Sequence, residues 1–156
     1  SAASDVYKRQ RILTKKYLSK IDEIKTKGYI TPGFDQKNPS DYLPYCELDN
    51  IQWDTGATQS VINKVLVEPL GLKPIGKDYV DGFGGTNVSY IYEVNIYTEG
   101  ELSFKRIKVL AGDIGGCDVL LGMDIISQGD FAITNKDNQT WFSFRYPSQD
   151  HIEFKA

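Results

Sequence analysis

The stretch that decides the fold is Trp53-Asp54-Thr55-Gly56-Ala57-Thr58. It continues the short apolar run that begins at Ile51, which predicts a strand, and Gly56 permits a tight turn directly after that strand. A carboxylate held on such a turn indicates a catalytic aspartate. Asp, Thr and Gly are also ordinary turn residues, so the triplet alone favours a plain turn at the end of a strand. The rest of the chain decides between the two interpretations.

Length and composition fit one compact domain. The chain has 156 residues, of which 40% are hydrophobic and 12% aromatic, enough to bury a core. No apolar run approaches the length of a membrane-spanning helix, so no membrane partner is indicated. Cys46 and Cys117 lack the spacing of metal ligands, and His151 is the only histidine. Metal sites built on two or three histidines are therefore excluded, and no cofactor is expected.

Charge is distributed unevenly along the chain. Residues 1–28 contain eight Lys and Arg against three Asp and Glu, which is +5; the remaining ten against eighteen give −8 for residues 29–156. The acidic remainder argues against a nucleic-acid partner. For the basic segment, the solvated face of a helix is favoured over a contact with nucleic acid or an anionic membrane.

The first ten residues, 1–10, are expected to be non-native. They contain no initiator Met, and residues 5–10 are what GAT GTG TAT AAG AGA CAG encodes, which resembles a sequencing-library adapter read in frame. On this hypothesis the true N-terminus is missing, and a signal peptide could have been lost with it. The compartment is then unknown, with the cytoplasm favoured.

Residues 11–41 are predicted to form an N-terminal helix and a linker. Leu13, Tyr17, Ile21 and Ile24 recur at steps of three and four residues, and Gly28 follows where a helix C-cap would lie. This spacing predicts an amphipathic helix over residues 11–27. Proline residues at 32 and 39 then indicate a linker, and the main domain is expected over residues 42–156.

Beyond residue 42 the pattern becomes that of a β protein. Two short strands are predicted on either side of Asp49-Asn50, and strict alternation from Val88 to Ile96 predicts a half-buried strand. A reversal of the alternation predicts a bulge near Lys105-Arg106. Short helices are predicted within residues 61–70 and 123–128, a short buried strand at 119–121, and a hairpin over 131–145. Many short strands and 14 glycines predict a mainly β, closed, barrel-like fold.

Two further motifs follow the Asp-Thr-Gly triplet in order. Residues 79–86 read Tyr-Val-Asp-Gly-Phe-Gly-Gly-Thr, a predicted glycine-rich hairpin tip, and Leu120-Leu121-Gly122 precedes a short predicted helix. With these three motifs in this order, residues 42–146 resemble the retropepsin-like aspartic proteases of the bacterial type. These enzymes are single-domain relatives of retroviral protease.

The resemblance implies a homodimeric aspartic endopeptidase with an acid-protease barrel, acting on peptides with apolar residues around the scissile bond. Two carboxylates that share one proton activate water and polarise the carbonyl, and this chain carries one triplet, so each subunit would contribute Asp54. At the catalytic turn, the resemblance implies that Thr55 hydrogen-bonds across the dimer axis and that Gly56 allows close approach of the two backbones. Substrate would be contacted by Ala57 and Thr58 and by a mobile flap tip formed by Phe83, Gly84 and Gly85. Behind the turn would pack Leu120, Leu121 and Gly122.

The chain departs from the family pattern at several positions. Trp53 stands where a smaller aliphatic residue or Phe is usual, and Thr58 stands where retroviral enzymes often carry Asp. Met123 replaces an arginine of the retroviral dimer interface. The alternative is a catalytically inactive, dimeric peptide-binding or scaffold domain on the same fold, in which Trp53 would crowd the cleft.

Overall fold

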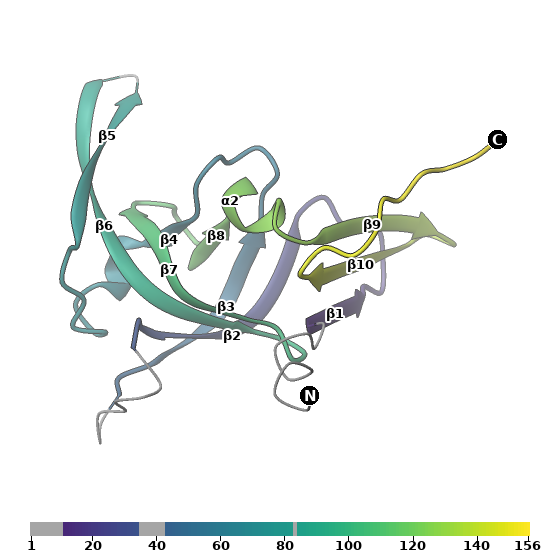
Figure 1. Ribbon diagram of the computed structural model, residues 1–156, viewed down its shortest axis with the longest axis horizontal. Helices are drawn as coiled ribbons and strands as arrows, with labels where there is room; N and C mark the ends of the chain where they lie inside the picture. Colours follow the sequence, from purple (N-terminus) through teal and green to yellow (C-terminus); the bar gives the residue numbers. More distant parts are fainter. Residues whose placement is uncertain (1–10, 35–42, 83) are drawn as a thin grey trace, which may run out of the picture.

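The computed structural model describes residues 11–34, 43–82 and 84–156, and within them the chain is built mainly of β-strands in two sheets (Figure 1). One sheet has three strands in the order β1-β10-β9, and the other has seven in the order β2-β3-β8-β4-β7-β6-β5. No helix in the described ranges is long and apolar enough to cross a bilayer. The elements are β1 (Arg11–Lys16), β2 (Ile24–Pro32), β3 (Cys46–Trp53), β4 (Val61–Asn63), the 3-10 turn η1 (Lys64–Leu66), β5 (Gly76–Gly82), β6 (Gly85–Thr98), β7 (Ser103–Gly112), β8 (Val119–Leu121), α2 (Met123–Ile126), β9 (Asp130–Lys136) and β10 (Gln139–Tyr146).

The larger sheet closes on itself. β2 pairs antiparallel with β3 along one side and with β6 along the other, so that Tyr29 lies opposite both Glu47 and Tyr97. Because the strands from β3 to β6 also pair in series, this double pairing of β2 makes a barrel. β5 lies outside the ring and pairs with the first half of β6 as a long hairpin. The predicted closed β-barrel is confirmed.

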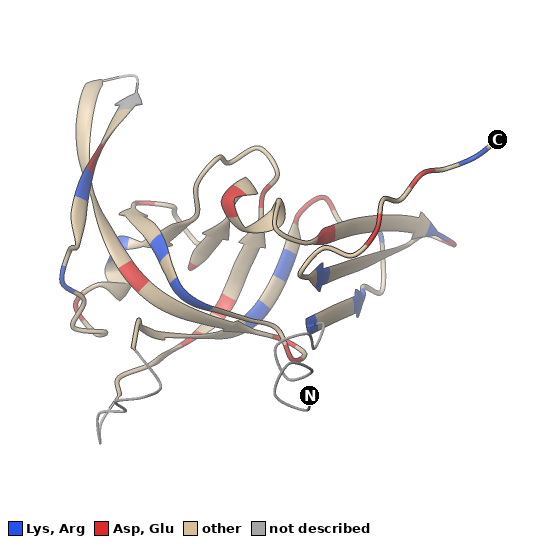
Figure 2. Ribbon diagram, viewed as in Figure 1, with Lys and Arg blue, Asp and Glu red and all other residues tan. Residues whose placement is uncertain are grey.

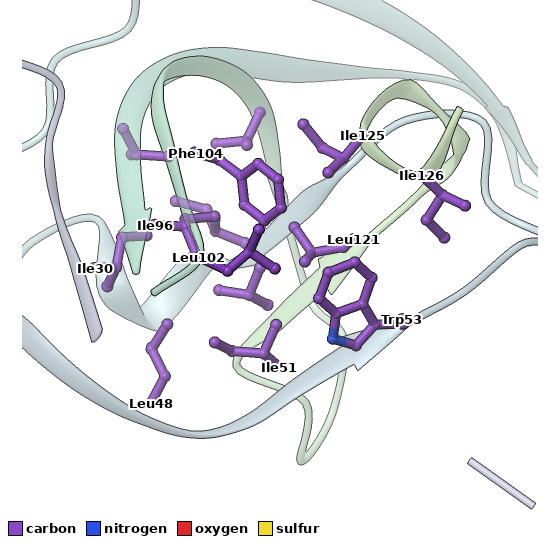
Figure 3. Packing of buried hydrophobic residues seen from close by; sticks show 14 of the residues in the cluster. Ile30, Leu48, Ile51, Trp53, Ile96, Leu102, Phe104, Leu121, Ile125 and Ile126 are labelled. Carbon is purple, nitrogen blue, oxygen red and sulfur yellow. The ribbon is translucent and has the colours of Figure 1, made fainter. Parts of the chain in front are cut away.

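The core fills the barrel and continues beneath the three-stranded sheet. In β6, Tyr92, Val94 and Ile96 are buried as the alternation predicted, but Val88 and Tyr90 are 49% and 43% exposed, because they lie in the half of β6 that pairs with β5 outside the barrel. Figure 3 shows Trp53, Phe104 and Leu121 converging from β3, β7 and β8. From β10, Phe142 and Phe144 are fully buried, and each packs against the indole of Trp53 with ring centroids 5.0 and 4.9 Å away. One continuous apolar core therefore joins the two sheets.

The predicted N-terminal helix over residues 11–27 is wrong. These residues form β1 and the first part of β2, which pair with β10 and β3. Leu13 and Ile24 are buried as expected, but from two separate strands, while Tyr17 and Ile21 lie partly buried in the connection between them. Pairing with strands distant in sequence outweighs the weak helix preference of a segment that contains Ile12, Thr14 and Thr26.

Two further expectations are corrected. The two strands predicted around Asp49-Asn50 form one strand, β3, because its pairing with β2 continues on both sides of an irregularity at these two residues. The Asp118 Oδ2 atom accepts hydrogen bonds from both the Asp49 and Asn50 backbone N–H groups at 3.0 Å. Residues 61–70 contain a strand and a 3-10 turn instead of an α-helix. There the Asn63 side chain accepts a hydrogen bond from the Val65 N–H and begins η1.

Three local predictions are confirmed. β7 carries an extra residue opposite Asn95 of β6, and Arg106, at φ 53°, donates its backbone N–H to the Asn95 Oδ1 atom at 2.7 Å, which is the predicted bulge. β9 and β10 form the predicted hairpin, joined by Asp137 and Asn138, which both have positive φ. Residues 119–121 form the short buried strand β8.

Candidate active site

The Asp54 turn is held from behind by the parallel strand β8. Trp53, the last residue of β3, lies opposite Leu121 of β8. One residue later, the Asp54 N–H donates to the Leu121 carbonyl oxygen at 2.8 Å. The chain then leaves the sheet, so the Asp54 side chain is half-buried while Thr55 and Gly56 are exposed. Strand pairing thus fixes the backbone that carries the carboxylate.

The turn also orients the carboxylate itself. The Gly56 N–H donates to the Asp54 Oδ1 atom at 2.8 Å, and the Ala57 N–H donates to the Asp54 carbonyl at 3.2 Å. A Cβ atom on Gly56 would lie 3.1 Å from that same Oδ1 atom. A glycine at this position therefore lets the backbone approach the carboxylate closely.

Leu120-Leu121-Gly122 packs directly against this turn. Leu121 is fully buried, and a Cβ atom on Gly122 would lie 2.7 Å from the Ala57 carbonyl oxygen. The Met123 N–H donates to that carbonyl at 2.7 Å. Two of the three motifs, distant in sequence, are therefore in contact through backbone atoms.

Ser60 and Asp124 brace the turn, and the sequence did not single out either residue for this contact. The Ser60 hydroxyl donates to Asp124 Oδ1 at 2.8 Å and accepts from the Gly122 N–H at 3.1 Å, while the Ser60 N–H donates to Asp124 Oδ2 at 3.0 Å. Asp124 lies in the first turn of α2, where an acidic residue is common, so its position gave a weak signal. Ser60 gave no local signal.

Trp53 does not crowd the site. Its side chain is 4% exposed and packs among the core residues (Figure 3). The indole Nε1 atom donates to the buried Thr26 Oγ1 atom at 3.0 Å, so its polar group is satisfied. The expected obstruction of the cleft is therefore wrong, because the period of a strand places residue 53 inward, toward the barrel core.

The β5–β6 hairpin extends beyond the barrel, as Figure 1 shows. Phe83 lies outside the described residues. Nothing lies within 4 Å of the Cβ positions of Gly84 and Gly85, and Gly85 has φ +101°. A single chain therefore brings Asp54 to Thr58 together with Leu120 to Gly122, but does not bring the described glycines of the hairpin tip against them.

A shallow hollow of about 260 Å³ borders the Asp54 turn. Asp54 and Thr55 line it together with residues of β9 and of the connection into β2. A larger hollow of about 550 Å³ lies at the other end of β3, beside Tyr29 and Tyr45. We place the site at the smaller one because it contains the oriented carboxylate.

No metal site is evident within the ranges 11–34, 43–82 and 84–156, where no group of three or more His, Cys, Asp or Glu side chains is arranged to hold an ion. Cys117 is buried, and its Sγ atom donates to the Val119 carbonyl at 3.1 Å. Burial raises the pKa of the Cys117 thiol. The thiol therefore remains protonated at neutral pH and packs as a small apolar group.

Comparison with known proteins agrees with this geometry. The family described as "gag-polyprotein putative aspartyl protease" matches residues 50–128, which include the Asp54 turn, the hairpin, β8 and α2. The chain belongs to the retropepsin-like aspartyl protease family.

Solved structures of the family are similar to the chain. A retropepsin-like aspartic protease from Rickettsia conorii is 14% identical, with a TM-score of 0.51, over 88% of this chain and 96% of that one, and shares its fold. The EIAV protease complexed with the inhibitor HBY-793 is 23% identical, with a TM-score of 0.43, over 68% of this chain and 86% of that one. No curated protein sequence matches the chain significantly.

Proposed function

We propose that the protein is an aspartic endopeptidase whose active site forms from two copies of the chain, each contributing Asp54. One carboxylate of the pair accepts a proton from the attacking water, and the other, protonated, polarises the peptide carbonyl. Two carboxylates in contact hold one proton between them in mildly acidic solution, where activity is expected to be highest.

The observation that carries this proposal is the orientation of the Asp54 carboxylate and the way in which its turn is held. The carboxylate accepts a hydrogen bond from the Gly56 N–H on an exposed turn. The Asp54 N–H of this turn donates to the Leu121 carbonyl, and the turn packs closely against Gly122. The chain contains one such triplet. A second copy related by a two-fold axis therefore supplies the second carboxylate.

The remaining roles follow from position. Thr55 and Gly56 are exposed at the tip of the turn, where the two copies would meet, while Ala57 and Thr58 would face the substrate. The β5–β6 hairpin, with Gly84 and Gly85 at its tip, would close over the bound peptide as a flap. Its large exposed side chains support a preference for apolar residues around the scissile bond; they are Tyr79, Val80, Val88 and Tyr90.

The test is cleavage of an unfolded protein mixture by the purified chain across acidic to neutral pH. Asp54→Asn keeps the shape of the side chain and removes its ability to exchange a proton, so turnover should fall by at least about a thousandfold. Asp150→Asn, in the exposed tail, is the matched control and should leave turnover unchanged. Equal activity of Asp54→Asn and the unmodified chain would exclude the mechanism.

The scaffold alternative loses its main support because Trp53 lies in the core. It predicts tight peptide binding without cleavage at any pH. A pepstatin-like transition-state analogue distinguishes the two functions: the enzyme should bind it in a manner that depends on Asp54, whereas a scaffold should bind it no better than an ordinary peptide.

A further inference from the structure

The hollow of about 550 Å³ at the start of β3 takes no part in the proposed catalytic site. Its walls come from β2, from the first half of β3 and from the segment that leads into β3, which contributes Leu43 and Tyr45. A hollow of this size, lined by aromatic and aliphatic groups with a few charged ones, has the composition of a ligand-binding site.

Tyr29 is the centre of a row of side chains that crosses three strands. It lies opposite Tyr97 of β6 and opposite Glu47 of β3, so the three side chains share one face of the sheet. The rings of Tyr29 and Tyr97 are stacked, with centroids 4.5 Å apart and planes at 12°. Because stacking covers the side of the Tyr29 ring that faces β6, its other side is turned toward β3 and Glu47.

Tyr45 forms a second aromatic wall of the same hollow. Its ring stands at 79° to that of Tyr29, with the two centroids 6.5 Å apart. The two side chains are 64% and 44% exposed, so the corner between them is open to solvent. The face of a tyrosine ring attracts a cation, and two rings at nearly a right angle offer a cation contact on two sides.

The charged residues of the hollow also favour a cation. Glu47 and Asp49 each contribute −1 and Lys27 contributes +1, which leaves −1. None of the described Lys and Arg side chains forms an ion pair with Glu47, and Lys25 of β2 is paired with Glu23 at 2.7 Å. Figure 2 shows the acidic residues of β3 beside the basic residues of β2. An apolar ligand would bury the Glu47 carboxylate without a partner, and an anion would be repelled.

We propose that this hollow binds an arginine side chain of a polypeptide. The guanidinium lies against the rings of Tyr29 and Tyr45 and donates to the Glu47 carboxylate, while the aliphatic part of the side chain contacts Leu43. Arginine fits these groups better than lysine because its guanidinium is planar and weakly hydrated, stacks on aromatic rings and donates two parallel hydrogen bonds to one carboxylate.

In the enzyme, and resting on the proposed function, the hollow is an exosite, a substrate-binding site separate from the active site. Asp54 lies seven residues beyond Glu47 along β3, which corresponds to about 20 Å. At least about six extended residues must therefore separate the bound arginine from the scissile bond. Long unfolded substrates occupy both sites, whereas short peptides reach only the active site.

The first test measures the binding of arginine without any cleavage. N-acetyl-arginine methylamide is titrated into the unmodified, ¹⁵N-labelled chain, and the backbone amide signals of Tyr29, Tyr45 and Glu47 should shift and saturate. Glu47→Gln should raise the dissociation constant about fivefold, and Lys27→Gln should lower it because a like charge is removed. Glu153→Gln, in the exposed tail, is the matched control and should leave it unchanged.

The same titration identifies the ligand chemistry. N-acetyl-lysine methylamide should bind more weakly than the arginine compound, and N-acetyl-norleucine methylamide should not saturate. Equal dissociation constants for Glu47→Gln and the unmodified chain overturn the site. So do shifts that never saturate and spread over acidic residues elsewhere on the surface.

The second test asks whether the site holds substrate. A six-residue sequence that the enzyme cleaves is compared with the same sequence extended, on either side, by a Gly-Ser linker of about ten residues that ends in arginine. Tyr45→Ser should raise KM for the extended peptide about two- to fivefold, without changing kcat or the kinetics of the short peptide. Alanine in place of the terminal arginine should abolish the effect.

The outcomes separate the exosite from the proposed function. A protease that depends on Asp54 and has the same KM for the arginine and alanine peptides overturns the exosite and leaves the proposed function intact. Saturable arginine binding that depends on Glu47, in a chain that cleaves nothing at any pH, overturns the proposed function and supports the arginine site.

Discussion

The β5–β6 and β9–β10 hairpins have the same secondary structure and opposite surroundings. The β5–β6 hairpin ends in Gly84 and Gly85, where an added Cβ atom would meet nothing within 4 Å, and it leaves Tyr79 and Val88 exposed. The β9–β10 hairpin is closed by a two-residue turn and buries Phe142 and Phe144 completely. Packing, and not hydrogen bonding within the hairpin, distinguishes an element that can open locally from one that fixes the fold.

The largest effect is expected from removing a ring of the packed hairpin. Phe142→Ala leaves a cavity beside Trp53 and Phe131, whose ring centroids lie 5.0 and 5.2 Å away, and should lower the free energy of unfolding by about 3–5 kcal/mol. Val88→Ala in the β5–β6 hairpin, where the side chain is 49% exposed, should cost less than about 0.5 kcal/mol. Urea unfolding measures both losses, and equal losses would refute the contrast.

A smaller effect on stability is expected at Gly122, where the core packs against the Asp54 turn. Gly122→Ala places a Cβ atom 2.7 Å from the Ala57 carbonyl, so the turn must shift, and stability should fall by about 1–3 kcal/mol together with proteolysis. Gly116→Ala is the control, because its Cβ atom would meet nothing within 4 Å. A Gly122→Ala chain with unchanged stability and turnover would show that the turn tolerates displacement.

The β9–β10 hairpin should also make the free energy of unfolding depend on pH. Hydrogen bonds from Ser148, Gln149 and Arg145 hold the pKa of Asp130 well below its usual range. The folded state therefore binds this proton more weakly than the unfolded state, so the stabilisation is complete above about pH 4 and is lost as pH falls below it. Thermal unfolding of the unmodified chain and of Asp130→Asn should differ at pH 6, and the difference should shrink steadily as pH falls below about 4. A constant difference would exclude this linkage.

The smallest change in stability is expected at the open tip. Gly85→Ala forces a side chain onto φ +101°, which strains the tip by about 1 kcal/mol. Because nothing packs on the tip, global unfolding should change little, while kcat should fall several-fold if the hairpin closes over substrate. Gly84→Ala, without a positive φ, is the control. An unaltered kcat for Gly85→Ala would argue against closure of the hairpin as a step in turnover.

The local motifs were predictable because their chemistry is contained in short segments. The Asp54 turn needs a glycine two residues on, and Leu120 to Gly122 needs only to be apolar and then small. Alternation from Tyr92 to Ile96 likewise reports which face of β6 is buried, whereas Val88 and Tyr90 continue the pattern into the exposed hairpin. From these local patterns the fold class, the Asp54 turn and the segment packed behind it could be predicted.

The missed features depend on partners distant in sequence. β1 pairs with β10, more than 120 residues later, and a spacing of three and four residues in a short segment does not distinguish a helix from two half-buried strands. Ser60 and Asp124, 64 residues apart, meet because β4 and α2 both adjoin β8. No local pattern encodes these contacts.

The burial of Trp53 gives the protein an internal optical reporter. The chain has two tryptophans, and Trp141, on β10, is 41% exposed beneath the Lys16 ammonium group. An aqueous quencher such as iodide should therefore suppress the emission of Trp141 and spare that of Trp53. The emission that remains comes from the residue that immediately precedes Asp54, so its wavelength follows the environment of the turn without any added label.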